Sequence, residues 1–146
     1  MDNESNLLKQ LKDKIPQVDI EIGTFKYVLL KAEFNEETYY FVRGFKRCPF
    51  HANNFQVFIE ELEKSQLFDS IGDLDDVQLC KKGDQKIKIT CTGGGRIQHD
   101  DKDQKIFVYG YSQGYGLAKH EISVEILKKQ YQQYPSDNIT WSNEGY

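Results

Sequence analysis

The sequence lacks an excess of basic residues and any long apolar run, and each absence excludes a class of protein. Its 146 residues hold 19 Lys and Arg against 23 Asp and Glu, for a formal net charge of −4. A broad nucleic-acid interface needs a basic face. The longest apolar runs, such as residues 27–30 and 39–42, are far too short to span a membrane. We therefore expect no nucleic-acid partner and no membrane association.

Cysteine and histidine are also scarce, which limits the sites that they can form. Cys48, Cys80 and Cys91 show no repeated spacing, so we expect no disulfide framework and a reducing compartment. Cys48 and His51 resemble half of a zinc knuckle, but no second half follows, and no two of the three histidines share metal-ligand spacing. We expect no metal ion and no other cofactor.

The first fourteen residues alternate charged side chains with a few leucines. This pattern fits neither the apolar core of a signal peptide nor an acid-poor transit peptide. We expect a cytoplasmic protein, and we expect it to be a monomer.

What the sequence does contain is the composition of a folded domain with a sheet. Nine Tyr and nine Phe supply large apolar surfaces, which disordered chains lack. Residues 25–34 and 38–43 are rich in β-branched and aromatic residues and flank a polar turn, which predicts a hairpin. Alternation over 86–92 predicts a strand that stops at the following glycines and forms a hairpin with 104–109. Residues 138–141 predict a short closing strand.

Helical spacing of apolar residues predicts two helices. One begins near His51 and the other ends before Pro135. The apolar stripes are Phe55, Phe58, Ile59 and Leu62 in the first and His120, Val124, Leu127 and Tyr131 in the second. A short amphipathic helix or turn fits residues 1–14, with Leu7, Leu8 and Leu11 on one side.

The acidic stretch 69–85 contains two glycines, so we expect a loop with a short edge strand near 77–80. The order of elements then predicts a single α+β domain with about six strands and two helices. We place this domain at 19–146, after an N-terminal extension over 1–18.

His51 is the first candidate for chemistry. A histidine at a helix N-terminus lies beside free backbone N–H groups and the positive end of the helix dipole, which together attract a phosphoryl oxyanion. One position would then offer both a base and an anion cradle. The alternative is that His51 caps the helix or packs on Pro49 and Phe50.

Further candidates are glycine-rich or basic. The small residues of 111–116 let consecutive N–H groups converge on an anion, although a turn that joins a strand to a helix explains the pattern equally well. Arg96 follows three glycines and suits bidentate phosphate contact or an exposed position. Lys26 and Arg43 interrupt apolar strands, where a cation needs solvent or an anion, so we expect one of them to face a pocket. His120 lies on an apolar stripe, which favours a hydrogen-bonded core histidine.

Six short blocks in this order resemble the 14 kDa phosphohistidine phosphatase and janus family. The blocks are Phe25–Leu29, Val42–Gly44, His51–Ala52, Gly93–Ile97, Val108–Ser112 and Thr140–Trp141. The resemblance implies a small domain with a mixed β-sheet flanked by two α-helices. It also implies hydrolysis of phosphohistidine in proteins or peptides without a metal ion.

Matched positions then imply roles for single residues. His51 falls on the catalytic histidine, Lys26 on a lysine that contacts substrate, and Ser112, Gln113 and Gly114 on the loop that holds phosphate, with Ala52 beside them. Four more residues match family positions with less defined roles, namely Arg43, Arg96, His99 and His120. The chain departs from the family pattern in its acidic N-terminal segment, in a longer stretch over 69–85 and in Cys48–Phe50.

Two alternatives concern the mechanism and the class of function. His51 activates water as a general base, which we favour, or attacks phosphorus itself. A non-catalytic module of the same fold would use the same pocket to bind phosphopeptides. A two-histidine phosphodiesterase would need paired histidine motifs that the chain does not have, and the acidic balance opposes single-stranded RNA binding on the tyrosines.

Overall fold

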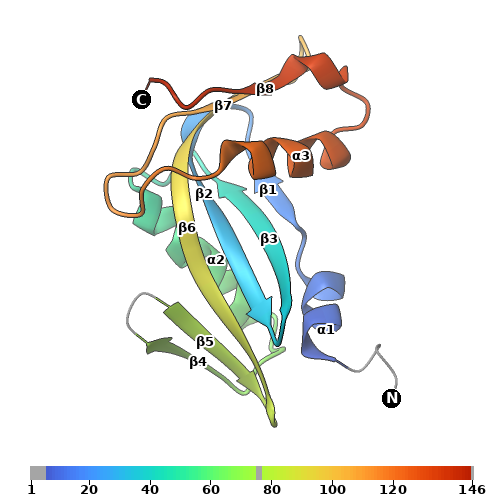
Figure 1. The fold of residues 1–146 in the computed structure, drawn as a ribbon, viewed down its shortest axis with the longest axis vertical. Helices are drawn as coiled ribbons and strands as arrows, with labels where there is room; N and C mark the ends of the chain where they lie inside the picture. Colours follow the sequence, from blue (N-terminus) through green and yellow to red (C-terminus); the bar gives the residue numbers. More distant parts are fainter. Residues whose placement is uncertain (1–5, 75–76, 146) are drawn as a thin grey trace.

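The computed structural model describes residues 6–74 and 77–145, which form an open mixed sheet with helices on both faces (Figure 1). Two pairs of strands, β1–β3 and β7–β8, are parallel, and the other pairs are antiparallel. The main path runs in the order β1 (Val18–Ile20), β3 (Glu37–Gly44), β2 (Gly23–Phe34), β6 (Gln85–Asp100), β5 (Val77–Lys82) and β4 (Ser70–Leu74). β7 (Lys105–Tyr109) pairs with β6 and with β8 (Ile139–Trp141).

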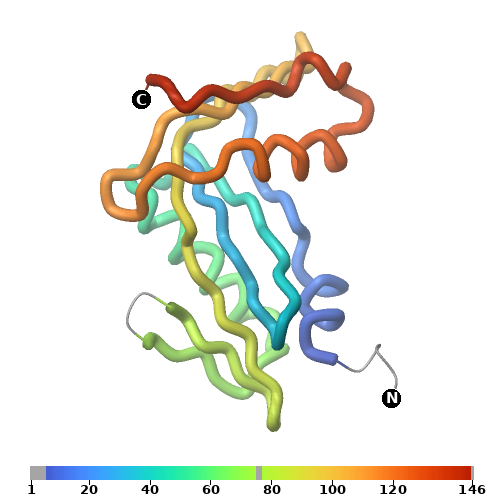
Figure 2. Tube along the Cα trace, viewed as in Figure 1, coloured from blue at the N-terminus to red at the C-terminus, as the bar shows by residue number. Residues whose placement is uncertain are grey.

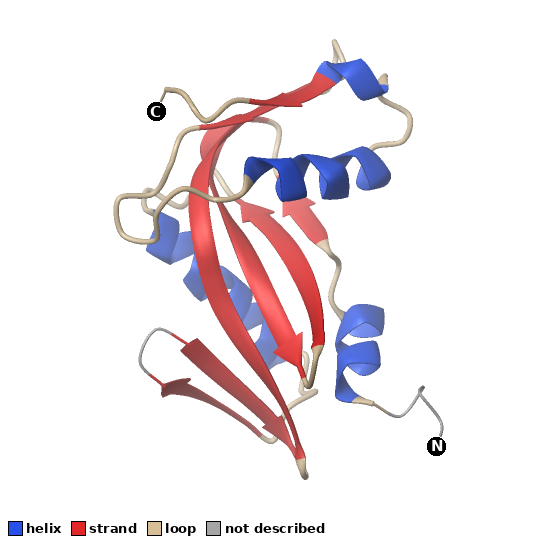
Figure 3. Cartoon of the chain, viewed as in Figure 1, coloured by secondary structure: helices blue, strands red, loops and turns tan. Residues whose placement is uncertain are grey.

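Three α-helices cover this sheet (Figure 3). They are α1 (Leu7–Lys14), α2 (His51–Lys64) and α3 (His120–Gln130), with a 3₁₀ turn at Ser136–Asn138. The expected α+β class with a mixed sheet is confirmed, and the described residues hold eight strands and three α-helices instead of about six and two. The added helix is α1, whose leucines are buried in one core with α2. The domain boundary after residue 18 stays a prediction, and residues 1–5 of that extension lie outside the described part.

β6 is longer than the sequence pattern indicated, because the glycines over 93–95 do not end it. The strand makes a bulge at this point: Leu29 of β2 pairs with Gly93, and Leu30 pairs with Cys91, so that Thr92 is an extra residue. A one-residue insertion reverses which side chains face which side of a sheet. Odd-numbered residues of β6 therefore face the α1 and α2 core before the bulge and the α3 core after it.

Two expectations about the strands beside β6 were wrong, the second of them only in part. The hairpin with β7 uses residues 96–100 and not 86–92, which pair with β5 and β2 instead. Within the stretch 69–85, the expected short strand near 77–80 is present as β5, but it is not the edge strand, because β4 pairs with it where a loop was expected. Residues 75 and 76 of that stretch lie outside the described residues. The strands were hard to recognise because β4 is mostly exposed and β5 mostly half-buried, so neither shows the regular alternation of buried and exposed residues.

All three cysteines are buried free thiols, and burial raises the pKa of Cys80 and of Cys91 to about 12. Across residues 6–74 and 77–145, no helix is both long enough and apolar enough to cross a bilayer.

Candidate functional site

His51 is the first residue of α2, and only 7% of its surface is exposed. Its Nε2 lies 2.9 Å from the carbonyl oxygen of Gly95 in β6. A carbonyl only accepts hydrogen bonds, so Nε2 carries the proton and Nδ1 keeps a lone pair. Among the described residues Nδ1 has no hydrogen-bond partner, which makes this nitrogen the available base.

The pKa of His51 is lowered from its usual value near 6.5. Burial is the main cause, because it disfavours the charged imidazolium. The Gly95 carbonyl opposes this effect, while the positive charges of Lys26 and Arg96 add to it. His51 is therefore neutral at pH 7, as a general base or a nucleophile must be.

Three successive glycines are required because other elements contact β6 from both faces. An added Cβ at Gly93 would lie 2.6 Å from the Cα of Ala118. At Gly94 it would lie 2.5 Å from Cδ2 of His51, and at Gly95 2.3 Å from the carbonyl oxygen of Tyr109. Real Cβ atoms do not approach other atoms this closely. Gly94 is thus the surface against which the His51 imidazole rests, and its two neighbours admit the close approach of Ala118 and Tyr109.

Lys26 and Arg96 lie beside His51 on the same face of the sheet. They are directly opposite each other in β2 and β6, so their side chains share one face. Gly94, two residues before Arg96, presents that same face to the His51 ring. The Lys26 ammonium donates a 2.8 Å hydrogen bond to the carbonyl of Pro49, just before α2. Two cations are therefore held at the start of the helix that carries His51.

Two asparagines position the start of α2, and sequence analysis identified neither. The buried Asn54 side chain accepts from the N–H of Phe45 at 3.0 Å and donates to the carbonyl of Lys26 at 3.0 Å. The Asn53 side chain accepts from the N–H of Phe50, also at 3.0 Å. Asn53 follows the pattern of a side chain that caps a helix start, whereas no sequence signal predicts the partners of Asn54. Asn54 therefore fixes α2 against β2, and Asn53 closes the first turn of α2.

The expected phosphate loop is a tight turn closed by its own backbone. Ser112 and Gly116 exchange backbone hydrogen bonds of 3.0 and 2.8 Å, and the Ser112 hydroxyl oxygen accepts from the N–H of Tyr115 at 3.1 Å. The N–H groups of Gln113 and Gly114 at the exposed tip have no acceptor among the described residues. An added Cβ at Gly114 would meet no atom within 4 Å. The turn leaves two backbone donors and open space around its tip.

This turn lies close to the start of α2 (Figure 2), since Tyr115 of the turn contacts Phe55 of the helix. The N–H of Gly94 donates to the carbonyl of Gly116 at 3.0 Å, so the turn is fixed to the strand that supports His51. Ala52 and Gly114 line the same cleft. The structure thus brings together most of the candidate phosphate contacts that sequence analysis named.

His120 is a fully buried core histidine on the opposite face, as its apolar stripe indicated. Its Nε2 donates to the carbonyl of Gly110 at 2.7 Å, and its Nδ1 accepts from the hydroxyl of Tyr27 at 2.7 Å. That hydroxyl in turn accepts from Ser123 at 2.9 Å. Burial lowers the pKa of His120. Gly110 leads into the turn at Ser112, so His120 supports the loop and does not point into the cleft on the α2 side.

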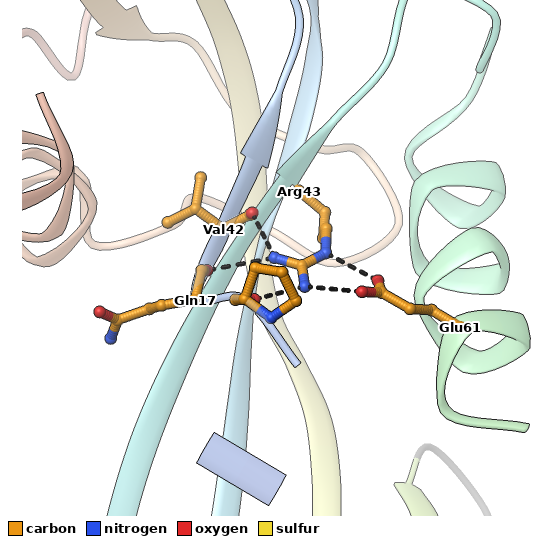
Figure 4. Close-up of polar contacts among 5 residues, drawn as sticks. Gln17, Val42, Arg43 and Glu61 are labelled. Atoms are coloured by element: carbon orange, nitrogen blue, oxygen red, sulfur yellow. Dashed lines mark hydrogen bonds and ion pairs between the residues drawn. The ribbon is translucent and has the colours of Figure 1, made fainter. Parts of the chain in front are cut away.

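Arg43 is completely buried, and its guanidinium is saturated by partners away from His51 (Figure 4). It forms an ion pair with Glu61 at 3.1 Å and donates to the carbonyls of Pro16, Gln17 and Val42. Glu61 lies ten residues after His51, about 15 Å along α2. Of the two cations in apolar strands, Lys26 is therefore the one at the candidate site.

His99 is buried and likewise paired within the core. Its Nδ1 donates to the carbonyl of Glu21 at 2.8 Å, and its Nε2 accepts from the hydroxyl of Tyr134 at 2.8 Å. Within residues 6–74 and 77–145, no group of three or more His, Cys, Asp or Glu side chains is placed to hold a metal ion.

Comparison with known proteins places these residues in a family. Residues 12–135 match the model of the Janus/Ocnus family. The chain is 38% identical over 141 residues to a 14 kDa phosphohistidine phosphatase of Sus scrofa, covering 91% of this chain and 94% of that protein. The corresponding protein of Homo sapiens is 36% identical over 140 residues, with coverage of 90% and 94%. The sex-regulated protein janus-A of Drosophila yakuba is 34% identical over 125 residues, with coverage of 85% and 76%. This chain therefore belongs to the Janus/Ocnus family.

Proposed function

We propose that the protein hydrolyses the P–N bond of phosphohistidine in proteins or peptides, with His51 as the catalytic base. The observation that carries this proposal is the state of His51: one ring nitrogen is bound to Gly95, and the other is a free base beside two cations. A module that only bound phosphate would have no use for a neutral histidine there. The similarity to proteins named phosphohistidine phosphatase supports the same conclusion.

The phosphoryl group would bind between α2 and the turn at Ser112. Phosphoryl transfer needs in-line positioning and neutralisation of charge on the equatorial oxygens. Lys26, the N–H of Ala52, the N–H groups of Gln113 and Gly114 and the hydroxyl of Ser112 would provide these donors. A fixed donor in such a site contributes about 3 kcal/mol. Because the charge is neutralised by the protein's own groups, we propose a reaction that is independent of metal ions.

His51 Nδ1 would take a proton from the attacking water as the oxygen bonds to phosphorus. The P–N bond then breaks, the leaving imidazole nitrogen takes up a proton from solvent, and His51 returns the proton it accepted to solvent. The Gly95 carbonyl stabilises the imidazolium that forms on His51, because it accepts the hydrogen bond of Nε2. The alternative is direct attack by Nδ1 on phosphorus, which leaves a phosphorylated His51. If a labelled phosphoenzyme can be trapped in a single-turnover quench, His51 acts as a nucleophile and not as a general base.

The test is phosphate release from a histidine-phosphorylated peptide in EDTA. Replacing the base in His51→Ala should lower kcat by about 10² to 10⁴-fold, and removing the cation in Lys26→Met should lower it by about 10²-fold. Lys88→Met, on an exposed part of β6, is the matched control and should keep full activity. Circular dichroism checks that each variant is folded. Binding without turnover by the unmodified protein would make it a phosphopeptide-binding module.

The natural substrates would be histidine-phosphorylated proteins. The three buried free thiols fit a reducing compartment, so we propose the cytoplasm as the location.

A further inference from the structure

The cleft that Ala52 and Gly114 line has a volume of about 550 Å³ and extends away from the proposed phosphoryl site. Ala52 and Gly114, two of the proposed phosphate contacts, form its near end. The cleft lies between α2 and the β4–β5 hairpin, with Asp73 and Gln78 on the hairpin side. Its size is typical of ligand sites. A peptide held at His51 by its phosphohistidine would therefore have its neighbouring side chains at the entrance of this cleft.

One wall of the cleft is apolar and belongs to α2 and the turn. Phe55 and Ile59 project from successive turns of α2, and Tyr115 meets Phe55 edge to face, with ring centroids 6.1 Å apart and an angle of 83°. These contacts also join α2 to the turn at Ser112, so this wall is fixed relative to His51. Such a surface suits the aliphatic stem of a long side chain.

The opposite wall is polar and carries one negative charge. Asp73 is the single charged residue among the described residues that line the cleft. Its Oδ1 accepts a hydrogen bond from the side chain of Gln78, which orients the carboxylate. Among the described residues, Oδ2 accepts no hydrogen bond. The cleft therefore offers an acceptor at the far side of an apolar surface, whereas Lys26 and Arg96 make the His51 end cationic.

We propose that this cleft is a specificity subsite for a lysine or arginine next to the phosphohistidine, and this inference rests on the proposed phosphatase function. The stem of the basic side chain packs on Phe55 and Tyr115, and its cation meets the carboxylate of Asp73. An acidic side chain in the same place would be repelled by the carboxylate of Asp73 and would bind less well. The substrates are then phosphohistidine segments with basic neighbours.

The test compares three substrates with the unmodified protein. They are a phosphohistidine peptide with lysine on both sides of the phosphohistidine, the same peptide with glutamate there, and phosphoramidate, which has no flanking residues. An exposed ion pair is worth about 2- to 5-fold in kcat/KM. We expect the lysine peptide to exceed the glutamate peptide by about that factor.

Two variants with the same change of charge separate the cleft from general electrostatics. Asp73→Lys should reverse the preference between the two peptides and leave phosphoramidate hydrolysis unchanged. Asp84→Lys, in the exposed turn between β5 and β6 and outside the cleft lining, should keep the original preference. Equal shifts in both variants, or no shift in Asp73→Lys while phosphoramidate is hydrolysed normally, would overturn the subsite alone. No hydrolysis of any substrate by the unmodified protein would overturn the phosphatase function, and the subsite with it.

Discussion

The contact between Gly94 and His51 allows a sharp test of how the site is built. In Gly94→Ala the new methyl group would lie 2.5 Å from Cδ2 of His51 and 2.8 Å from the carbonyl oxygen of Tyr27. Unstrained carbon atoms stay about 3.5 Å apart, so the imidazole must withdraw by about 1 Å. The Tyr27 carbonyl belongs to the central strand β2 and cannot move away independently. The hydrogen bond from Nε2 to Gly95, now 2.9 Å, is then stretched or lost.

These displacements set the expected size of the effect. A misplacement of 1 Å at a reacting group lowers the rate by about 10²-fold, and overpacking of a tight site costs about 1 to 3 kcal/mol. We expect Gly94→Ala to lower kcat about 100-fold per folded molecule and to lower the free energy of unfolding by about 1 to 3 kcal/mol. Phosphate release at saturating peptide and urea unfolding measure the two quantities on the same samples.

Two comparisons isolate the contact with the ring. Gly72→Ala in β4 places a Cβ where no atom lies within 4 Å, and it should change neither quantity appreciably. Gly94→Ala made together with His51→Ala should destabilise less than it does alone, because one of the two clashing groups is gone. If Gly94→Ala lowers stability but keeps the full kcat per folded molecule, the glycine does not position the imidazole, and the reasoning is refuted.

The remaining predictions concern pH and the buried ion pair. Burial lowers the pKa of His51, and the neutral form of this histidine is the active one. We therefore expect kcat/KM to stay level as pH falls to 6.5 and to decline only at lower pH. A pH–rate profile in which kcat/KM already declines above pH 7 would contradict this. Because the pKa of His51 is lower in the folded state than in the unfolded state, its contribution to stability is fully present above about pH 6.5 and is lost as pH falls through the lowered pKa. Urea unfolding of the unmodified protein and of His51→Ala at several pH values measures this contribution. Glu61→Gln should destabilise by about 2 to 3 kcal/mol in urea unfolding with little change in kcat, because it leaves the Arg43 charge buried without its carboxylate. Glu63→Gln on the exposed side of α2 should be neutral, and an equal loss in both would show that the ion pair is unimportant.

The features that the sequence predicted best are helices and strands with a regular apolar face, and the position of His51 near the start of a helix. The β2–β3 hairpin and the helices α2 and α3 follow from periodicity, because each buries one regular face. His51 could be placed near a helix start because the apolar stripe of α2 begins at Phe55, about one turn after it. These parts depend on neighbours close in sequence.

The features that sequence analysis missed depend on partners in other elements of the fold. The glycines at 93–95 resemble the end of a strand, and only the approach of His51, Ala118 and Tyr109 from other elements explains why they continue one. The partner of Arg43 is Glu61, on a helix that packs across the strand. The same holds for Asn54, which contacts residues 45 and 26. Local pattern contains no information about such contacts.

The long antiparallel pairing between β2 and β6 determines when the site can exist at all. Tyr27 pairs with Gly95, and closing a contact about 70 residues apart is slow, which places sheets of this kind in the millisecond-to-second range of folding times. The β2–β3 hairpin and α2 are local and can form earlier, but a chain at that stage would have His51 without the carbonyl that fixes its tautomer and without the turn at Ser112. Recovery of phosphate release during refolding would therefore report the arrival of the last central strand, whereas the far-ultraviolet signal of the helices would precede it.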